Sequence, residues 1–315
     1  MRYIFLAVVI CLVMISIGGA SQKDSVNIYL RKGGFAIQDN DIPTAIANFE
    51  NALRLDSSSA NAWKNLGVIY SARKNYQKSL ECLQKARLFD TTDAEIINNL
   101  GVTYLGLNDT AKALEAYRRA LIKNPENGMY AKNLASLLLV AKRYSEAAST
   151  LTNALKIDSS DAETYFLLGN IYFTQDNLTK SEGYYDKAVA LNSLEARYCY
   201  NQGVVKDKLG KSYEAEVAYK KTLNLEPNHF DAHQHLGVLY ITSQKYPEAL
   251  TEFKQAVKIQ PQSDEARIAL GAAYMYNDMP KEAKTVYDTL QKRNPAAAQK
   301  MMDLIMPLVD TTGRN

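Results

Sequence analysis

An asparagine recurs at one fixed interval in the first two thirds of this chain. Asn65, Asn99 and Asn133 are 34 residues apart, and Asn201 follows two such intervals later. A side-chain amide carries hydrogen-bond donors and an acceptor, so it can bind a peptide carbonyl and a peptide N–H. A row of amides therefore predicts a surface that holds the backbone of an extended peptide. The alternative is that these asparagines are exposed helix residues that contact only water.

The residues directly before the first three of these asparagines are also polar. They are Lys64, Asn98 and Lys132. The two ammonium groups would attract acidic groups of a ligand, and Asn98 adds a further amide. We include all three in the predicted binding surface.

The three histidines of the chain lie close together at His229, His233 and His235, with Asp231 between them. Imidazole and carboxylate groups are common metal ligands. The spacing argues against a metal site, because residues two apart on a helix point to nearly opposite sides. His235 stands at the repeat position of the asparagines, so we assign it to the binding surface and expect no metal or other cofactor.

Neither the motifs nor the charge of the chain indicate an enzyme or a nucleic-acid-binding protein. A phosphate-binding glycine loop, an H-E-x-x-H motif and a G-x-S-x-G motif are all missing from the sequence. The 37 Lys and Arg residues nearly balance the 34 Asp and Glu residues. Nucleic-acid-binding proteins concentrate positive charge, so we expect no nucleic acid among the partners.

These residues are positioned by a pattern that returns every 34 residues, eight times, without an insertion. One repeat position is always small, and so is the position twelve residues further on, which lets two helices approach closely. The first position holds Gly33, Gly67, Gly101, Ala135, Gly169, Gly203, Gly237 and Gly271, and the second holds Ala45, Ser79, Ala113, Ala147, Ser181, Ala215, Ala249 and Ala283.

Large residues and prolines follow the same period. Four residues after the second small position, six copies have an aromatic residue: Phe49, Tyr117, Tyr185, Tyr219, Phe253 and Tyr287. Seven of the eight prolines fall just past a second helix or near the start of one, where a helix tolerates them. Since no strand-like alternation interrupts the pattern, the sequence predicts an all-α solenoid.

In its clearest copy the pattern reads Trp63-x2-Leu66-Gly67-x2-Tyr70, which resembles the signature of the tetratricopeptide repeat (TPR) family. The resemblance covers residues 26–297 and implies a right-handed superhelical α-solenoid of helix–turn–helix repeats. Because stacked repeats share a continuous core, we expect no division into separate domains. The implied repeats are 26–59, 60–93, 94–127, 128–161, 162–195, 196–229, 230–263 and 264–297.

In this family the first helices of the repeats line a concave groove that receives an extended peptide or a partner helix. The row of asparagines looks like the asparagine ladder in the TPR groove of O-linked N-acetylglucosamine transferase. No transferase domain follows the repeats, so the resemblance implies no glycosylation activity. Further along the groove, Phe166 and Tyr200 occupy comparable inner positions and predict an apolar second half, unless they pack between neighbouring helices.

The carboxylate clamp of chaperone-binding members of the family is not matched. Lys64 is present, but Val68 stands at the position of its partner asparagine. The third copy then offers Met129 and Asn133 where the clamp has two cations. Without these cations there is no fork for a terminal carboxylate, so we expect no chaperone-tail ligand.

The N-terminal residues 1–20 do not belong to the repeats. Arg2 is followed by an apolar run from Tyr3 to Ile17 and by small residues before Ser21, which predicts a cleaved signal peptide. The alternative is an uncleaved membrane anchor, because the run is almost long enough to span a bilayer. Both predict repeats outside the cytoplasm, either exported (periplasmic, secreted or lumenal) or anchored to a membrane.

The repeats are flanked by a predicted short linker at residues 21–25 and by residues 298–315, which predict a capping helix and a tail. Met301, Met302 and Met306 make this last segment apolar. We interpret it as the cover of the eighth repeat, and the alternative is a methionine-rich docking surface.

Together these features predict a non-enzymatic scaffold that binds a peptide or partner segment in its concave groove outside the cytoplasm. The alternative is a structural or assembly subunit of a membrane-attached complex. An enzyme or a metal-binding protein is the least favoured interpretation.

Overall fold

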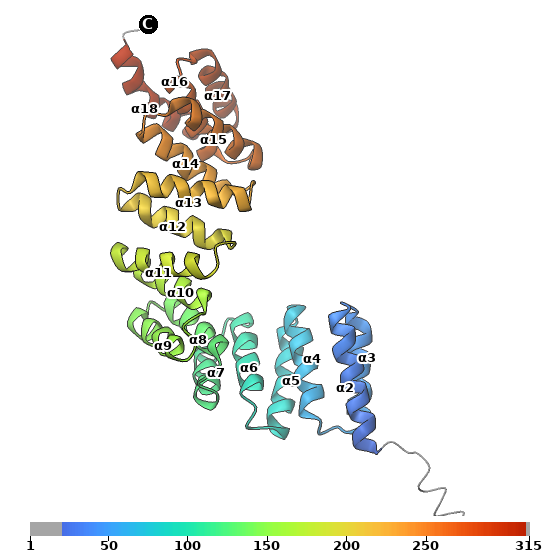
Figure 1. Ribbon diagram of the computed structural model, residues 1–315. Coiled ribbons are helices and arrows are strands. Elements are labelled where there is room, and N and C mark those ends of the chain that lie inside the picture. The colour runs from blue at the N-terminus through green and yellow to red at the C-terminus, as the bar shows by residue number, and fades with distance from the viewer. Residues whose placement is uncertain (1–20, 313–315) are drawn as a thin grey trace, which may run out of the picture. The chain divides into compact units, whose positions relative to one another are not determined.

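The computed structural model describes residues 21–312, and within this range every regular element is an α-helix (Figure 1). The predicted signal peptide or membrane anchor at residues 1–20 lies outside the described residues. The helices are α2 (Gln22–Gln38), α3 (Ile42–Leu55), α4 (Ala60–Ala72), α5 (Tyr76–Phe89), α6 (Ala94–Gly106), α7 (Thr110–Lys123), α8 (Gly128–Val140), α9 (Tyr144–Ile157), α10 (Ala162–Thr174), α11 (Leu178–Leu191), α12 (Ala196–Lys208), α13 (Ser212–Leu225), α14 (Phe230–Thr242), α15 (Tyr246–Ile259), α16 (Asp264–Tyr276), α17 (Pro280–Arg293) and α18 (Pro295–Thr312).

Consecutive helices pack as antiparallel pairs, which confirms the predicted all-α fold of helix–turn–helix repeats. From α4 to α16, the first helix of each pair begins at the first residue of a predicted repeat. Helix α2 differs, because Ser21 and Asp24 form a capping box that starts it at Gln22. Residues 22–25, most of the predicted linker, therefore belong to the first helix.

A left-handed residue forms the turn inside each repeat. These residues have φ between 56° and 73°, and they stand 34 positions apart at Asn40, Lys74, Asn108, Lys142, Asp176, Gly210, Gln244 and Asp278. Left-handed backbone is tolerated best by glycine, asparagine and aspartate, which occupy five of the eight turns. The turn chemistry therefore repeats with the same period as the packing.

The small and large positions of the pattern meet inside each repeat. The rings of Phe49, Tyr117, Tyr185, Tyr219 and Phe253 lie against Gly33, Gly101, Gly169, Gly203 and Gly237, where an added Cβ would come within 2.5–2.7 Å of a ring carbon. Such a distance is far inside van der Waals contact. The glycines are therefore required for the close approach of the two helices in a pair.

The two serines at the second small position each form a hydrogen bond to the backbone of the facing helix. Ser79 and Ser181 are fully buried, and their hydroxyls donate to the carbonyls of Gly67 (2.8 Å) and Gly169 (2.9 Å). A buried hydroxyl without a partner would be costly. These bonds let serine replace alanine without that cost.

Helix α18 covers the last pair, α16 and α17. Ala298, Met301 and Ile305 are buried against these helices, and the Met301 side chain takes the place over Gly271 that a ring occupies in other repeats. Leu304 and Met306 are 50% and 46% exposed. The segment therefore lies where a capping helix would lie, with part of its apolar surface open.

The helices form two compact units, one up to Ile157 (α2–α9) and one from Asp158 (α10–α18). This division differs from our expectation of one undivided stack. The boundary between the units lies after α9, at the end of the fourth repeat. This repeat has Ala135 and Leu151 where most other repeats have a glycine and an aromatic ring. The fourth repeat therefore lacks the packing pair that joins the helices of most other repeats.

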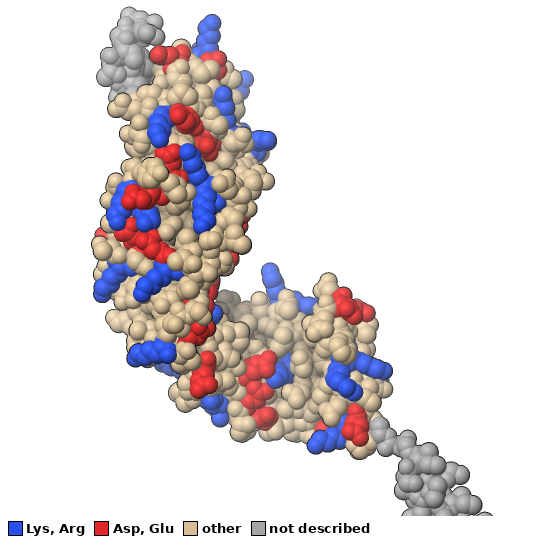
Figure 2. Space-filling model, in the orientation of Figure 1, with Lys and Arg blue, Asp and Glu red and all other residues tan. Residues whose placement is uncertain are grey.

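On the face shown in Figure 2, basic and acidic side chains are interspersed in each unit. Ion pairs also join successive repeats, as between Lys211 and Glu182 (2.7 Å) and between Lys245 and Glu216 (2.8 Å). Within residues 21–312, no helix is both long enough and apolar enough to cross a membrane.

Candidate functional site

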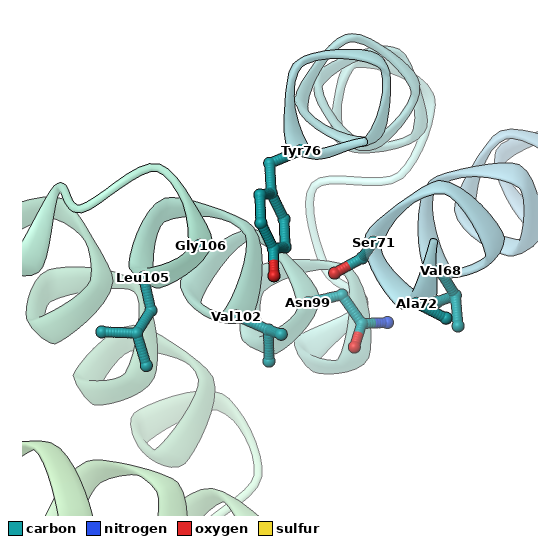
Figure 3. A pocket seen from close by; sticks show the side chains of 8 residues that line it. All are labelled: Val68, Ser71, Ala72, Tyr76, Asn99, Val102, Leu105 and Gly106. Carbon is teal, nitrogen blue, oxygen red and sulfur yellow. The ribbon is translucent and has the colours of Figure 1, made fainter. Parts of the chain in front are cut away.

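The first helices of neighbouring repeats contact each other directly, as α4 contacts α6 and α12 contacts α14. Between α4 and α6 the surface is hollowed to a volume of about 570 Å³ (Figure 3). We call this space the α4–α6 hollow. It is lined by Val68, Ser71, Ala72, Tyr76, Asn99, Val102, Leu105 and Gly106.

Small residues keep the α4–α6 hollow open. Ala72 and Gly106 occupy the same position in successive repeats, where the next repeat has Val140. The Tyr76 ring, which enters from the start of α5, lies directly against the backbone of Gly106 (Figure 3). A Cβ at Gly106 would overlap this ring, so glycine is required for the ring to lie here.

Most of the wall of the α4–α6 hollow is apolar and reaches solvent. The side chains of Val68, Val102 and Leu105 are 39%, 39% and 44% exposed. Val68 projects from α4, and Val102 and Leu105 project from α6 (Figure 3). Exposed apolar side chains that share one concave surface are typical of ligand-binding sites.

Among the polar groups of this site, the Asn99 amide is buried and lacks a partner for its donor. Its Nδ2 atom is buried and has no hydrogen-bond partner among residues 21–312. A buried donor left unsatisfied costs about 1–3 kcal/mol. The α4–α6 hollow thus combines an apolar wall with a desolvated amide, whose Nδ2 must turn toward the space to meet a ligand carbonyl.

The other members of the asparagine row already have partners. The amides of Asn65 and Asn201 donate to carbonyls one turn earlier in their own helices, at 2.7 Å and 2.8 Å. Asn133 donates to the side-chain oxygen of Asn98 at 2.9 Å, and Asn98 is only 2% exposed. Among these four asparagines, Asn99 is the one whose amide nitrogen is buried without a hydrogen-bond partner in the described residues.

The two lysines beside the row are engaged within the protein. Lys64 binds Asp93 at 3.0 Å and Glu95 at 2.6 Å, and its side chain is 13% exposed. Burial disfavours the charge of Lys64, but the bonds to Glu95 and Asp93 outweigh it and raise the pKa of the ammonium group. Lys132 is half-buried and also has a partner within the chain. The charge of Lys64 is therefore already neutralised before any acidic ligand arrives.

Phe166 and Tyr200, predicted to form an apolar groove in the second half, lie in different surroundings. Phe166 is 7% exposed and packs on Tyr185 and Tyr198, with ring centroids 5.8 Å and 4.9 Å away. This is the alternative in which the side chain packs between helices. Tyr200 is half-buried and contacts the ring of His235 at 5.8 Å.

His235 and His233 point to different environments, as expected for residues two apart. His235 stacks on Tyr219 at 5.7 Å, and burial lowers the pKa of its imidazole. His233 is 7% exposed, with Nδ1 bound to Glu252 at 2.6 Å and Nε2 to the Pro227 carbonyl at 3.0 Å. Both ring nitrogens of His233 are thus engaged by protein groups, which leaves neither for a metal ion.

Sequence reasoning missed Tyr76 and Gly106, although each left a signal. Gly106 is a glycine outside the two small positions of the repeat, and no other repeat has glycine there. A glycine that packing within the repeat does not require indicates a close approach by another group. Here that group is the Tyr76 ring.

Comparison with protein-family models gives matches to three models described as tetratricopeptide repeat. One matches residues 98–162, 144–196 and 200–264, and the others match residues 58–121 and 241–304. Among curated proteins, the general transcriptional corepressor trfA of Dictyostelium discoideum is 28% identical over 95 residues. That match covers 30% of this chain and only 7% of the corepressor's length.

Similar folds occur among solved structures. The C-terminal part of a TPR repeat-containing protein from Cytophaga hutchinsonii aligns with a TM-score of 0.62 and 15% identity, over 75% of this chain and 97% of that one. A tetratricopeptide repeat protein from Parabacteroides merdae aligns with a TM-score of 0.58 and 18% identity, over 78% and 97%. YrrB, described as a TPR protein with an unusual peptide-binding site, aligns with a TM-score of 0.50 and 23% identity, over 59% and 96%. At these identities the likeness concerns the fold alone.

Proposed function

The chain belongs to the tetratricopeptide repeat family and is a protein–protein interaction scaffold, and on this premise we propose that the α4–α6 hollow binds an extended peptide segment of a partner. An apolar side chain of the peptide enters the space between Val68, Val102 and Leu105. The Asn99 amide turns its Nδ2, which is buried in the free protein, toward this space and donates a hydrogen bond to a backbone carbonyl of the peptide.

The observation that supports this proposal most strongly is the buried, unpartnered donor of Asn99 beside a largely apolar wall. A folded protein retains such a group at a cost in stability. A ligand carbonyl would recover that cost on binding, because the donor is already desolvated. The apolar wall contributes further, since each buried methylene of a ligand is worth about 0.8 kcal/mol.

The test compares two asparagines that differ in their partners. Peptides are first selected with the full-length protein from a random linear library, and their affinities are then measured by fluorescence anisotropy. Asn99→Ala is expected to weaken binding by about 0.5–1.5 kcal/mol, roughly threefold to tenfold, which is the usual worth of one hydrogen bond. Asn65→Ala is the control, because the Asn65 amide is satisfied by its own helix.

Thermal unfolding of the two variants distinguishes binding from folding. Asn99→Ala removes an unsatisfied donor, so its stability should equal or exceed that of the parent protein. Equal loss of affinity in the Asn65 and Asn99 variants, or no loss in either, would contradict the proposal. Failure to select any peptide would contradict peptide binding altogether.

We also propose that the repeats act outside the cytoplasm, on the strength of the apolar run at residues 3–17. Fractionation of the native host and N-terminal sequencing test this. A mature protein that begins at Ser21 supports a signal peptide, and an intact chain in the membrane fraction supports an anchored assembly subunit. An intact chain in the cytoplasmic fraction would contradict both.

A further inference from the structure

In the second unit, α12 and α14 occupy the repeat positions of α4 and α6 but carry different side chains. Exactly four repeats separate α4 and α6 from α12 and α14, so Asp207 stands at the position of Ser71, and His235 at that of Asn99. The apolar wall is retained, because Val238 is the equivalent of Val102 and is 51% exposed. An acidic and an imidazole side chain thus replace a hydroxyl and an amide, and Lys208, Ser212 and Thr242 stand where the α4–α6 hollow has Ala72, Tyr76 and Gly106.

The carboxylate of Asp207 has no partner within the described chain. It is half-buried, yet no group among residues 21–312 hydrogen-bonds to it or forms an ion pair with it. Burial raises its pKa by more than the nearby charges lower it. The charges of His235 and Lys208 lower this pKa, but neither residue forms a hydrogen bond or an ion pair with the carboxylate.

Two other partly buried carboxylates of the second unit are each paired with lysines. Glu182 is bound by Lys206 at 3.0 Å and by Lys211 at 2.7 Å. Glu216 is bound by Lys220 at 2.7 Å and by Lys245 at 2.8 Å. Compared with these, Asp207 lacks the cation that a partly buried carboxylate normally has.

The charge of Asp207 acts on Tyr219 and His235, and the ring of Tyr200 packs against both of these residues. Tyr219 is fully buried, its hydroxyl has no hydrogen-bond partner among the described residues, and burial together with the charge of Asp207 raises its pKa. The His235 ring stacks on Tyr219 at 5.7 Å and meets the edge of Tyr200 at 5.8 Å. Asp231, which is exposed at the start of α14, also acts on His235 and adds negative charge. We call Tyr200, Asp207, Tyr219 and His235 the Asp207 cluster.

We propose that the Asp207 cluster is a receptor for a basic side chain, lysine or arginine, of a peptide segment that the second unit binds. The proposal rests on the proposed peptide-binding function and adds the chemistry of the ligand. The cation pairs with the Asp207 carboxylate, and the rings of Tyr200 and His235 border it, because aromatic faces attract cations. His235 suits this place while its ring is neutral, since an imidazolium would compete for the same carboxylate.

The test asks whether basic residues in selected peptides depend on Asp207. The full-length protein, Asp207→Asn and Glu214→Gln each select from the same random linear peptide library. Glu214 is an exposed carboxylate on α13 outside the cluster, so its variant controls for the loss of one negative charge. We expect a recurrent lysine or arginine in peptides selected by the parent and the Glu214 variant, and no such preference with Asp207→Asn.

A double-mutant cycle with one selected peptide then measures the contact itself. Replacing the basic residue of the peptide by norleucine should lower its affinity for the parent protein about tenfold. The Asp207→Asn substitution should lower the affinity for the basic peptide to a similar degree. In the Asp207 variant the norleucine change should have almost no further effect. Circular dichroism and thermal unfolding check the fold, which Asp207→Asn should not destabilise because it removes an unpaired, partly buried charge.

The outcomes separate this proposal from the one on which it rests. Peptides that bind without a basic preference, or a norleucine change that costs the same in the parent and in Asp207→Asn, would overturn the basic receptor and leave peptide binding intact. If neither the parent nor the variants select a peptide, peptide binding fails, and the receptor fails with it.

Discussion

One chemical change, made at two equivalent positions, is expected to alter stability in opposite directions. Tyr185 and Tyr219 occupy the same position in successive repeats, and both rings lie against a glycine of the first helix. The Tyr185 hydroxyl donates to Asn170 Oδ1 at 2.7 Å. In the next repeat Val204 replaces Asn170, so the Tyr219 hydroxyl is buried without a partner.

The size of each effect follows from these contacts. Tyr185→Phe loses one hydrogen bond, which is worth about 0.5–1.5 kcal/mol net, and should lower the free energy of unfolding by that amount. Tyr219→Phe removes a hydroxyl whose burial is uncompensated, which costs about 1–3 kcal/mol, and should raise the free energy of unfolding. Neither change should open a cavity beyond one oxygen atom, because Phe49 and Phe253 fill the same position in other repeats.

Urea denaturation of the full-length protein, followed by circular dichroism, measures both variants in the same unit. The midpoint should fall for Tyr185→Phe and rise for Tyr219→Phe, with similar slopes of free energy against urea. Amide hydrogen exchange of α13 provides a second reading that is local to the Tyr219 repeat. It should slow in the Tyr219 variant.

A fall of both midpoints by similar amounts would refute this reasoning. It would mean that the Tyr219 hydroxyl has a partner, such as an ordered water, and is not an uncompensated group. The opposite signs of the two stability changes follow from the difference between Asn170 and Val204 at one repeat position. Adding Val204→Asn to Tyr219→Phe should therefore remove part of the gain in stability, because the new amide oxygen faces a ring without a hydroxyl donor.

Two further predictions concern the second unit. Burial lowers the pKa of His233, but the bond to Glu252 outweighs burial and raises it. The pair therefore stabilises the fold fully below about pH 6.5, the ordinary pKa of histidine, and the free energy of unfolding should fall as the pH rises through the raised pKa. His233→Gln should remove this pH dependence from urea midpoints, and an unchanged dependence would contradict the assignment. Gly169→Ala should destabilise the protein by about 1–3 kcal/mol, because its Cβ meets the Tyr185 ring. Its control, Gly183→Ala, lies in a helix interior with open space around it and should stabilise by about 0.5–1 kcal/mol. Loss of stability in both glycine variants, measured by thermal unfolding, would show that the close packing against Tyr185 is not the cause.

The helices and their packing could be predicted closely from the sequence, because each is set by residues a fixed distance apart. The positions of Gly169 and Tyr185 within one repeat already imply a ring against a bare backbone, and the structure places them so. The turn residues, such as Asn40 and Gly210, follow the same period. The start of α2 was not predicted, because the Ser21 and Asp24 capping box precedes the first recognisable repeat.

The candidate site was predicted only in part. Asn99 was singled out with Asn65, because the two stand at one repeat position and are chemically identical. Their different roles depend on what each amide reaches, and Asn65 reaches its own helix while Asn99 Nδ2 reaches nothing. Lys64 was predicted to attract acidic ligands, but Asp93 and Glu95 of the next repeat already bind it.

The sequence by itself therefore determined the family, the all-α repeat and which residues occupy equivalent places, because a strict period carries that information directly. Tertiary structure decided which of those equivalent side chains remain unsatisfied. Asn99 shares its repeat position with Asn65, Asn133 and Asn201, yet its donor alone among these amides lacks a partner in the described residues, because of what the surrounding residues place beside it. Hydrogen bonds and ion pairs depend on distances of a few tenths of an ångström between elements, and a repeat pattern does not specify distances at that scale.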